Sequence, residues 1–420
     1  MTSKPIKPKP KVKAKTASKP AAKAPDPFAA LRRRVAKKLE GFTTAFPDEL
    51  DPWSMSSGRP DSSDFPVPEL VLFLFRNLMG WKWSGRGEKV RWSVYGSVKG
   101  EPIGFELRKF GFTILRAGDA TVPTSRIVGQ INSALKDVEA FLEPYAKAQV
   151  ESGHVLIANR FEEFDSRYRF FRERAEKAYA KASEPPLHKK PNTPKKGKKS
   201  KKVDLAELNL GIADLLNHTW SANREGFFHS TAMVDAYFSA LEHRLVLLRA
   251  FTGAALAPGE LTQILAAKWD NKLKAVLPIG GNRETELLFG KMRRIKERIR
   301  NPFAHGGVEN DKGSLFFHLP SIGAIPANFT RFGDSIRFSV IPIEADDHAE
   351  CCAVFDELDQ LLSAGPLAGP HRLMDAGVDP SFDAVTIADY GTAVAGTEQE
   401  LEQFLSAWSH NWERHANMDY

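Results

Sequence analysis

A lysine-rich segment near the middle of the chain most constrains how it can fold. The stretch HKKPNTPKKGKKSKK, residues 188–202, carries eight lysines, two prolines and a glycine, with no acidic and no large apolar side chain. Such a segment repels itself and has nothing to bury in a hydrophobic core, so we expect a solvated linker over residues 184–203. The 420-residue chain is therefore expected to fold as two bodies, one on each side of this linker.

A second basic segment begins the chain. Residues 1–25 hold eight lysines and no acidic residue among prolines and alanines, which predicts a disordered tail over residues 1–26. Removing the sixteen lysines of the two segments from the net charge of +7 leaves −9 for the remainder. The folded body is therefore mildly acidic, and the basic segments either attract polyanions such as nucleic acid or serve as solubilising segments.

Between the tail and the linker, the pattern of apolar residues predicts a small α/β domain over residues 65–183, preceded by a short helix and a loop over residues 27–64. PELVLFLFRNLMGW is typical of a helix with proline in its first turn. KVRWSVYGS, EPIGFELR and GFTILRA alternate apolar and polar residues and predict a three-stranded antiparallel sheet, with Trp92 on its apolar face. Two amphipathic helices follow, the second with an apolar stripe from Phe161 to Tyr179.

Beyond the linker, residues 204–420 are predicted to form a helical domain. STAMVDAYFSALEHRLVLLRAFTG is a long helix that ends at Gly253, and its apolar stripe is Val234, Phe238, Leu241, Leu245 and Leu248. PGELTQILAAKWDNKLKAV is the next helix, and NRETELLFGKMRRIKERIRN is the third, capped by Asn282. GSLFFHL and SIRFSVIPI predict an inserted β-hairpin, and ADDHAECCAVFDELDQLLSAG and TEQELEQFLSAWSHNWERHA predict two further helices. The whole chain is thus expected to be α+β and mostly α.

The sequence argues against several classes of protein. No run reaches the roughly 18 apolar residues of a membrane-spanning helix, and the N-terminus lacks the apolar segment of a secretory signal. The cysteines, Cys351 and Cys352, are adjacent, which fits neither a metal-binding spacing nor a disulfide framework, so we expect buried thiols on a helix. We therefore expect a cytoplasmic protein without a metal, a cofactor or a membrane partner.

The end of the third helix combines residues that a helix stop does not need. In RIRNPFAHGG, residues 298–307, Pro302 must kink or end the helix near Asn301, which can cap a new turn. These roles explain neither Arg300, which lies on a basic flank beside the apolar stripe, nor His305. Arginine binds phosphate through two N–H groups, and histidine exchanges a proton near neutral pH. Such a pair can cleave RNA without a metal, because the 2′-hydroxyl is an internal nucleophile.

This stretch resembles the motif of a known superfamily. The pattern R-N-x-x-x-H at a helix end, from Arg300 to His305, is similar to the R-x(4–6)-H signature of HEPN domains, and VDAYFSALEHRLVLLRAF looks like their opening helix. The resemblance covers about residues 204–365. It implies a metal-independent endoribonuclease that works as a homodimer, with two copies of the motif in one cleft, and products that carry a 2′,3′-cyclic phosphate and a 5′-hydroxyl. By this match, Arg300 would stabilise the phosphate, His305 would be the acid and base, and Asn301 would help to place them.

Other residues carry weaker signals. Glu242 on the long helix can orient an arginine or histidine, or form an ordinary surface salt bridge, and His243 and His318 are interpreted as structural. The segment GWKWSGRGEKVRW, residues 80–92, interleaves aromatic and basic residues as proteins that bind single-stranded nucleic acid do. Its candidates for binding are Trp81, Trp83, Arg86 and Arg91.

These observations lead to a prediction with two alternatives. We predict an RNA-cleaving effector of the toxin or antiviral-defence type, in which the C-terminal domain cuts RNA as a homodimer through Arg300, Asn301 and His305. The N-terminal domain would sense a trigger, bind a partner such as a neutralising antitoxin, or recruit RNA. The first alternative is a non-catalytic module that binds RNA or a nucleotide, and the second is a purely structural dimer. The sequence leaves open whether Arg300 and His305 meet within one chain or across two.

Overall fold

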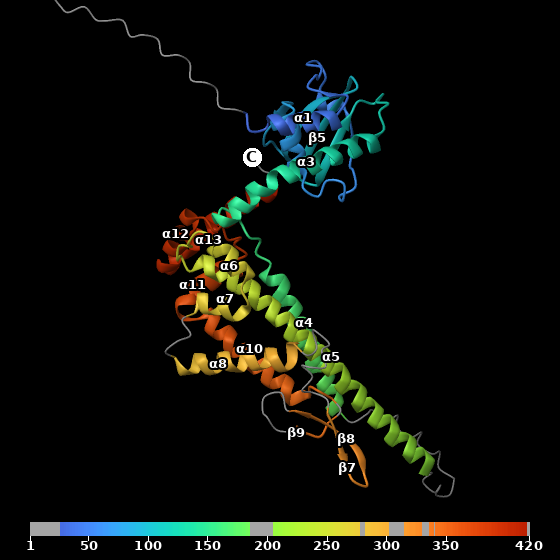
Figure 1. Ribbon diagram of the computed structural model, residues 1–420, viewed down its shortest axis with the longest axis vertical. Helices are drawn as coiled ribbons and strands as arrows, with labels where there is room; N and C mark the ends of the chain where they lie inside the picture. The colour runs from blue at the N-terminus through green and yellow to red at the C-terminus, as the bar shows by residue number, and fades with distance from the viewer. Residues whose placement is uncertain are drawn as a thin grey trace, which may run out of the picture. The chain divides into compact units, whose positions relative to one another are not determined.

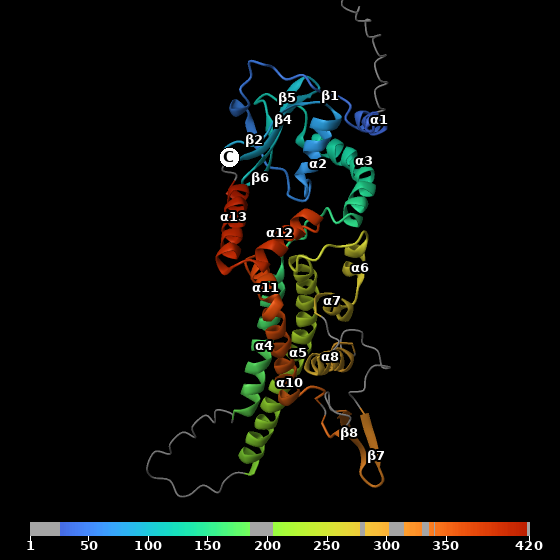
Figure 2. The same cartoon turned by 90° about the vertical axis from the view of Figure 1, so that its left-hand side faces the viewer.

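The parts of the chain that the computed structural model describes are residues 26–184, 205–277, 282–301, 315–329, 336–339 and 341–417. The chain divides into two compact units, Met1–Glu143 with Arg414–Tyr420 and Pro144–Glu413 (Figures 1 and 2). It is α+β and mostly helical, as the sequence predicts. The predicted tail and linker lie almost entirely outside the described residues. Within those residues, no helix combines the length and apolar character needed to cross a bilayer.

The first unit is built on an antiparallel sheet of six strands in the order β1-β4-β5-β6-β2, with β3 also paired to β4. The strands are β1 (Phe42–Thr43), β2 (Ser56–Gly58), β3 (Lys82–Ser84), β4 (Val90–Val98), β5 (Glu101–Arg108) and β6 (Gly111–Arg116). The three predicted strands are confirmed as the central meander, but the expected total of three is wrong. The additional strands span only two or three residues, which is too short to display an alternating pattern in the sequence.

One face of this sheet carries the core of the first unit. It packs against α1 (Ala29–Lys38), α2 (Pro68–Leu72) with the π-helical turn that continues it (Phe73–Leu78), and the part of α3 (Thr124–Glu151) that precedes Pro144 (Figure 2). Trp92 is 3% exposed in this core, which confirms its predicted place on the apolar face.

The boundary between the units differs from the one that the linker suggested. Helix α4 (Phe161–Ser183) belongs to the second unit, because it packs along α5 (Leu205–Phe251). Residues 27–64 are not a separate connection either, since Leu31 and Val35 of α1 are fully buried in the first core. A lysine-rich stretch marks where the chain can leave a core, but it does not determine which core the flanking helices join.

Helix α5 is the centre of the second unit. All five residues of its predicted apolar stripe are buried, and Tyr237 stacks on Phe355 of α10 (Ala345–Ser363) with 3.7 Å between ring centroids. The predicted stop is confirmed at Gly253, where φ is +73° and an added Cβ would lie 2.4 Å from the Cα of Gly391. Any other residue at this position would have a strained backbone, and its Cβ would clash with Gly391.

Further helices surround α5 and α10. They are α6 (Glu260–Ala266), α7 (Trp269–Val276), α8 (Arg283–Ile295) with the π-helical turn η3 (Lys296–Arg300), α11 (Ala368–Asp375), α12 (Ala384–Ala395) and α13 (Glu398–Asn417). The predicted cap of α8 is confirmed, since Asn282 Oδ1 accepts hydrogen bonds from the N–H groups of Glu284 and Thr285. The single helix predicted over residues 258–276 is two helices, because the chain becomes extended at Ala267 and Lys268. Helices α11 and α12 were not predicted.

A small antiparallel sheet is inserted between α8 and α10. It consists of β7 (Leu315–Leu319), β8 (Gly323–Phe329) and β9 (Ile336–Arg337) in that order. GSLFFHL thus forms a strand as predicted, but its partner is the segment around Pro326 that the sequence suggested was a loop. Of the residues of SIRFSVIPI that the structure describes, two form a strand, β9. These pair with Asn328 and Phe329, beyond the proline that lacks an N–H.

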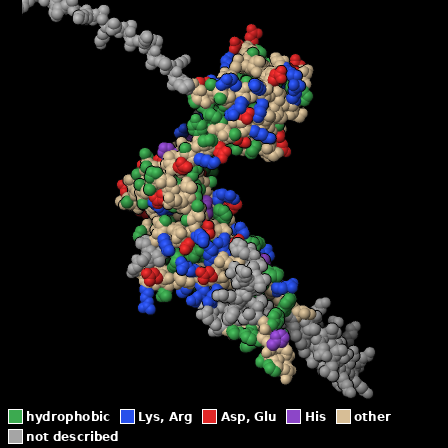
Figure 3. Space-filling model, viewed as in Figure 1, with side chains coloured by type: hydrophobic (Ala, Val, Ile, Leu, Met, Phe, Trp, Pro, Cys, Tyr) green, Lys and Arg blue, Asp and Glu red, His purple; other side chains and the backbone are tan. Residues whose placement is uncertain are grey.

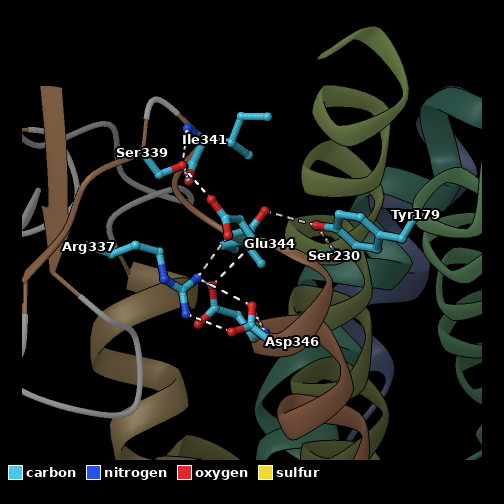
Figure 4. A network of polar contacts seen from close by, with 9 residues as sticks. Tyr179, Ser230, Arg337, Ser339, Ile341, Glu344 and Asp346 are labelled. Carbon is cyan, nitrogen blue, oxygen red and sulfur yellow. Dashed lines mark hydrogen bonds and ion pairs between the residues drawn. The ribbon is translucent and has the colours of Figure 1, made fainter. Parts of the chain in front are cut away.

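Polar contacts attach β9 to the start of α10 (Figure 4). Arg337 donates to Asp346 at 2.7 Å and to Asp347 at 2.8 Å. Glu344 caps α10, because its side chain and that of Asp347 each accept from a backbone N–H of the first turn. This charged cluster fixes the end of the inserted sheet relative to α10.

Candidate functional site

The candidate site is the surface between η3 and α5, where Arg300 lies. Its side chain is 23% exposed, while the preceding Ile299 is 1% exposed and packs in the core. Arg300 is the last residue of the π-helical turn η3, and its guanidinium lies over α5. Its carbon Cζ lies 5.5 Å from the ring centroid of Phe238. The predicted basic flank beside the apolar stripe is therefore present and rests on an aromatic ring.

Two carboxylates of α5 hold Arg300 from either side of Phe238. Arg300 Nε donates to Asp235 Oδ1 at 3.1 Å, and its Nη1 lies 3.8 Å from Glu242 Oε1. Asp235 and Glu242 are seven residues apart, two helical turns, and therefore lie on one face of α5. A guanidinium has five N–H donors, so these contacts leave it able to donate to a phosphate as well.

Further cations surround these carboxylates. Arg167 of α4 lies 3.7 Å from Asp235, and Lys272 of α7 lies 3.6 Å from Glu242. Lys296, one turn before Arg300, lies 6.0 Å from the Phe238 ring centroid, and burial together with the charge of Arg300 lowers the pKa of its ammonium group. The region is thus a mixed network in which cations outnumber anions, although basic and acidic side chains alternate over the visible surface of both units (Figure 3).

Asn301 differs from its predicted role as a helix cap. Its dihedral angles are helical, φ −64° and ψ −47°, and its N–H donates to the carbonyl of Lys296. An N-cap residue normally has extended dihedral angles, so Asn301 continues the helix instead of opening a new turn. Its side chain is half-buried directly beside Arg300 in the sequence. Pro302 and His305, the remaining residues of the predicted motif, lie outside the described residues.

The other candidate residues separate into structural and exposed groups. Glu242 forms the salt bridges described above. His243 is structural as predicted: its Nε2 accepts from the backbone N–H of Arg160 at 3.0 Å, and burial lowers the pKa of its imidazole. His318 is exposed on β7. Trp81 is 2% exposed in the first core, so it is not available to stack on a base.

The remaining residues of the aromatic and basic segment lie at the surface. Trp83 is 44% exposed, and Arg76 stacks on its ring at 3.4 Å. Arg91 lies 3.3 Å from Glu69, and Arg86 is exposed. Of the two tryptophans predicted to stack on single-stranded nucleic acid, Trp81 is therefore excluded and Trp83 remains exposed.

Sequence reasoning missed Asp235, which among the described residues makes the shortest polar contact with Arg300. The signal was present in the sequence, because Asp235, Phe238 and Glu242 follow the spacing of one helical face. It becomes informative only once η3 is known to pack against that face.

A group of potential metal ligands lies elsewhere in the second unit. Within the described residues, Glu176, His348 and Cys352 each offer a ligand atom within 4.8 Å of the others. The cysteines are buried on α10 as predicted. The interpretation that their spacing excludes a metal considered only the two cysteines and not their neighbours in space.

The chain was compared with protein-family models, curated proteins and solved structures. No family model matches the chain, and neither the curated proteins nor the solved structures contain a significant match.

Proposed function

We propose that the second unit is a metal-independent endoribonuclease in which Arg300 and His305 act on a phosphodiester of RNA. The observation that supports it is the position of Arg300. A partly exposed guanidinium in η3 is held by Asp235 and Glu242, five residues before His305 in the chain. An arginine oriented in this way can bind a phosphate with little loss of side-chain entropy.

The chemistry follows from the residue types. The 2′-hydroxyl loses its proton to a neutral imidazole and attacks the adjacent phosphorus. The bond from phosphorus to the 5′-oxygen breaks, and an imidazolium returns a proton to that oxygen. Arg300 stabilises the charge that develops on the phosphate oxygens. The products are a 2′,3′-cyclic phosphate and a 5′-hydroxyl.

We further propose that two copies of the chain supply the two histidines, one as base and one as acid, in an HEPN-like homodimer. The first unit would recruit RNA or bind a trigger or neutralising partner in the cytoplasm. Toxin or antiviral-defence activity is the biological setting that this chemistry suits.

A non-catalytic RNA- or nucleotide-binding module is the second candidate. The same geometry supports it, because an Arg300 oriented by two carboxylates can bind a phosphate whether or not a bond to phosphorus is then broken. The two functions differ in what happens to bound RNA.

One experiment separates them. The full chain is incubated with total RNA in EDTA, together with Arg300→Ala and His305→Ala. Arg294→Ala and His318→Ala serve as matched controls, because both residues are exposed and lie outside the proposed machinery. We expect cleavage by the wild type and both controls, and a loss of about 10²–10³-fold in each of the other variants. RNA binding without cleavage would favour the second candidate, and full activity of His305→Ala would refute the enzyme.

A further inference from the structure

Helices α4 and α10 bring three chemically different ligands together at the edge of the second core. Glu176 comes from α4, and His348 and Cys352 come from successive turns of α10. The two α10 residues are four apart, so their side chains lie on one face of the helix. Both are buried, whereas Glu176 is exposed. The group therefore extends from the core to the surface.

The distance between the two buried ligands suits a metal ion. His348 Nε2 lies 3.5 Å from Cys352 Sγ. Zinc binds imidazole nitrogen at about 2.0–2.1 Å and thiolate sulfur at about 2.3 Å, and a tetrahedral angle then places the two ligand atoms about 3.5 Å apart. The two helical residues are thus spaced as two ligands of one zinc ion.

The imidazole is oriented for this role. His348 Nδ1 is hydrogen-bonded to Ser230 Oγ at 3.0 Å, and that leaves Nε2 directed at Cys352. Ser230 itself donates to the hydroxyl of Tyr179, which donates to the carbonyl of Ile343 (Figure 4). A polar partner on the second ring nitrogen is typical of zinc-bound histidine.

The charges also balance. A thiolate and a carboxylate carry two negative charges, which neutralise a divalent cation. Arg172 contacts Glu176 at 3.2 Å, but its own charge is balanced by Asp356 at 2.9 Å. Met233 Sδ lies 3.7 Å from Cys352 Sγ, so a soft thioether adjoins the thiol. Soft sulfur donors beside imidazole favour zinc over magnesium or calcium.

An entry route is present on the side of Glu176. A surface pocket of about 350 Å³ is lined by Glu176, Arg172 and Asp356, together with other polar residues of α4 and α10. Water and ions can therefore reach the carboxylate while the sulfur and imidazole remain buried.

We propose that Glu176, His348 and Cys352 bind one Zn²⁺ per chain, with water or Met233 as the fourth ligand. The ion joins α4 to α10 and stabilises the fold of the second unit. It takes no part in RNA cleavage. Binding displaces the proton of the Cys352 thiol into solvent.

The experiment uses the neighbouring cysteine as a matched control. The full chain, Cys352→Ser and Cys351→Ser are produced in zinc-supplemented medium and dialysed against metal-free buffer, and zinc is counted by mass spectrometry. Cys351 and Cys352 are both buried on α10, but Cys351 is not part of the ligand group. We expect about one zinc per chain in the wild type and Cys351→Ser, and none in Cys352→Ser. A wild type without zinc, or equal zinc in the two variants, would overturn the proposal.

Two further measurements distinguish the loss of a metal ligand from misfolding of a variant. Cobalt substituted into the wild type and Cys351→Ser is expected to show thiolate-to-metal absorption and the strong visible bands of a tetrahedral site, whereas a weak octahedral spectrum contradicts the site. Ser230→Ala retains all three ligands and is expected to weaken zinc affinity about 10–100-fold, because it removes the partner that orients His348. Unchanged affinity would count against the assigned geometry. These readouts do not involve RNA, so they stand or fall independently of the proposed nuclease.

Discussion

Two arginine–aspartate pairs connect α5 to its neighbours, and they differ in their access to water. Arg244 on α5 donates to Asp359 of α10 at 2.7 Å, and its side chain is 5% exposed. Arg300 on η3 donates to Asp235 of α5 at 3.1 Å, and its side chain is 23% exposed. Asp359 also accepts from the hydroxyl of Tyr237, whereas Asp235 is shared with Arg167, which is itself half exposed.

The difference shows how one kind of ion pair can serve two purposes. A buried arginine cannot exchange its partner for a ligand, so the Arg244 pair can only stabilise the packing of α5 on α10. A partly exposed arginine retains donors that face solvent, and its carboxylates fix its direction without enclosing it. We therefore expect the first pair to contribute to stability and the second to remain available for the proposed RNA ligand.

The largest expected effect is on stability. Asp359→Ala leaves the Arg244 guanidinium buried without its counterion, which is expected to lower the free energy of unfolding by about 3 kcal/mol. Urea unfolding followed by circular dichroism measures this loss. The double variant Arg244→Met, Asp359→Asn removes the buried, unpaired charge and should recover most of the lost free energy of unfolding. A loss below about 1 kcal/mol for Asp359→Ala would remove the distinction between the pairs.

Arg300→Ala tests the other side of the comparison. The pair is partly exposed, so its removal is expected to change the free energy of unfolding by at most about 1 kcal/mol. RNA cleavage is expected to fall about 10²–10³-fold, because phosphate stabilisation is lost. Unfolding and cleavage are measured on the same preparation. A large loss of stability with little loss of cleavage would make Arg300 a structural residue like Arg244.

Asp235→Ala is expected to have a smaller effect on cleavage. Arg300 keeps Glu242 but loses its shortest contact, so kcat should fall roughly tenfold while KM changes little. Asp235→Asn retains an acceptor oxygen and should recover part of the rate. If KM rises instead and the asparagine gives no recovery, Asp235 does not position the arginine.

The smallest expected effect is at Asp383, a half-buried carboxylate far from both arginine pairs in the sequence. Asp383 caps α12, and hydrogen bonds from the backbone and hydroxyl of Thr386 and from the hydroxyl of Ser381 lower its pKa to about 2. Asp383→Ala is expected to cost about 1 kcal/mol at neutral pH. Because folding lowers the pKa of Asp383, its carboxylate stabilises the folded state fully above about pH 4, and this stabilisation is lost as the pH falls towards 2. The difference in melting temperature between variant and wild type should shrink over that range; a constant difference would contradict the cap.

Much of the local structure could be predicted because its causes are local. The alternation in β4, β5 and β6, the 3.6-residue stripe of α5, the Asn282 cap and the Gly253 stop depend on residues within a few positions of one another. The short strands β1, β2 and β3 and the break between α6 and α7 were missed. Each depends on pairing or packing with distant segments.

The candidate site divides in the same way. The sequence indicated Arg300 and Glu242 by residue type and spacing, but it could not show that Asp235 is the nearest partner of Arg300. It correctly placed Cys352 as a buried thiol on a helix, but it could not show that Glu176 and His348 lie beside it, because a group made from α4 and α10 has no spacing that can be read along the chain.

The sequence by itself determined the long helices, the three central strands of the first sheet and where several of these elements end, since backbone hydrogen bonding and side-chain periodicity act over a few residues. Only the tertiary structure decided that α4 joins the second core, that Arg300 lies between two carboxylates, and that Glu176 meets His348 and Cys352. These outcomes depend on which apolar faces bury one another across long stretches of chain, and that choice brings together polar groups which the sequence keeps far apart.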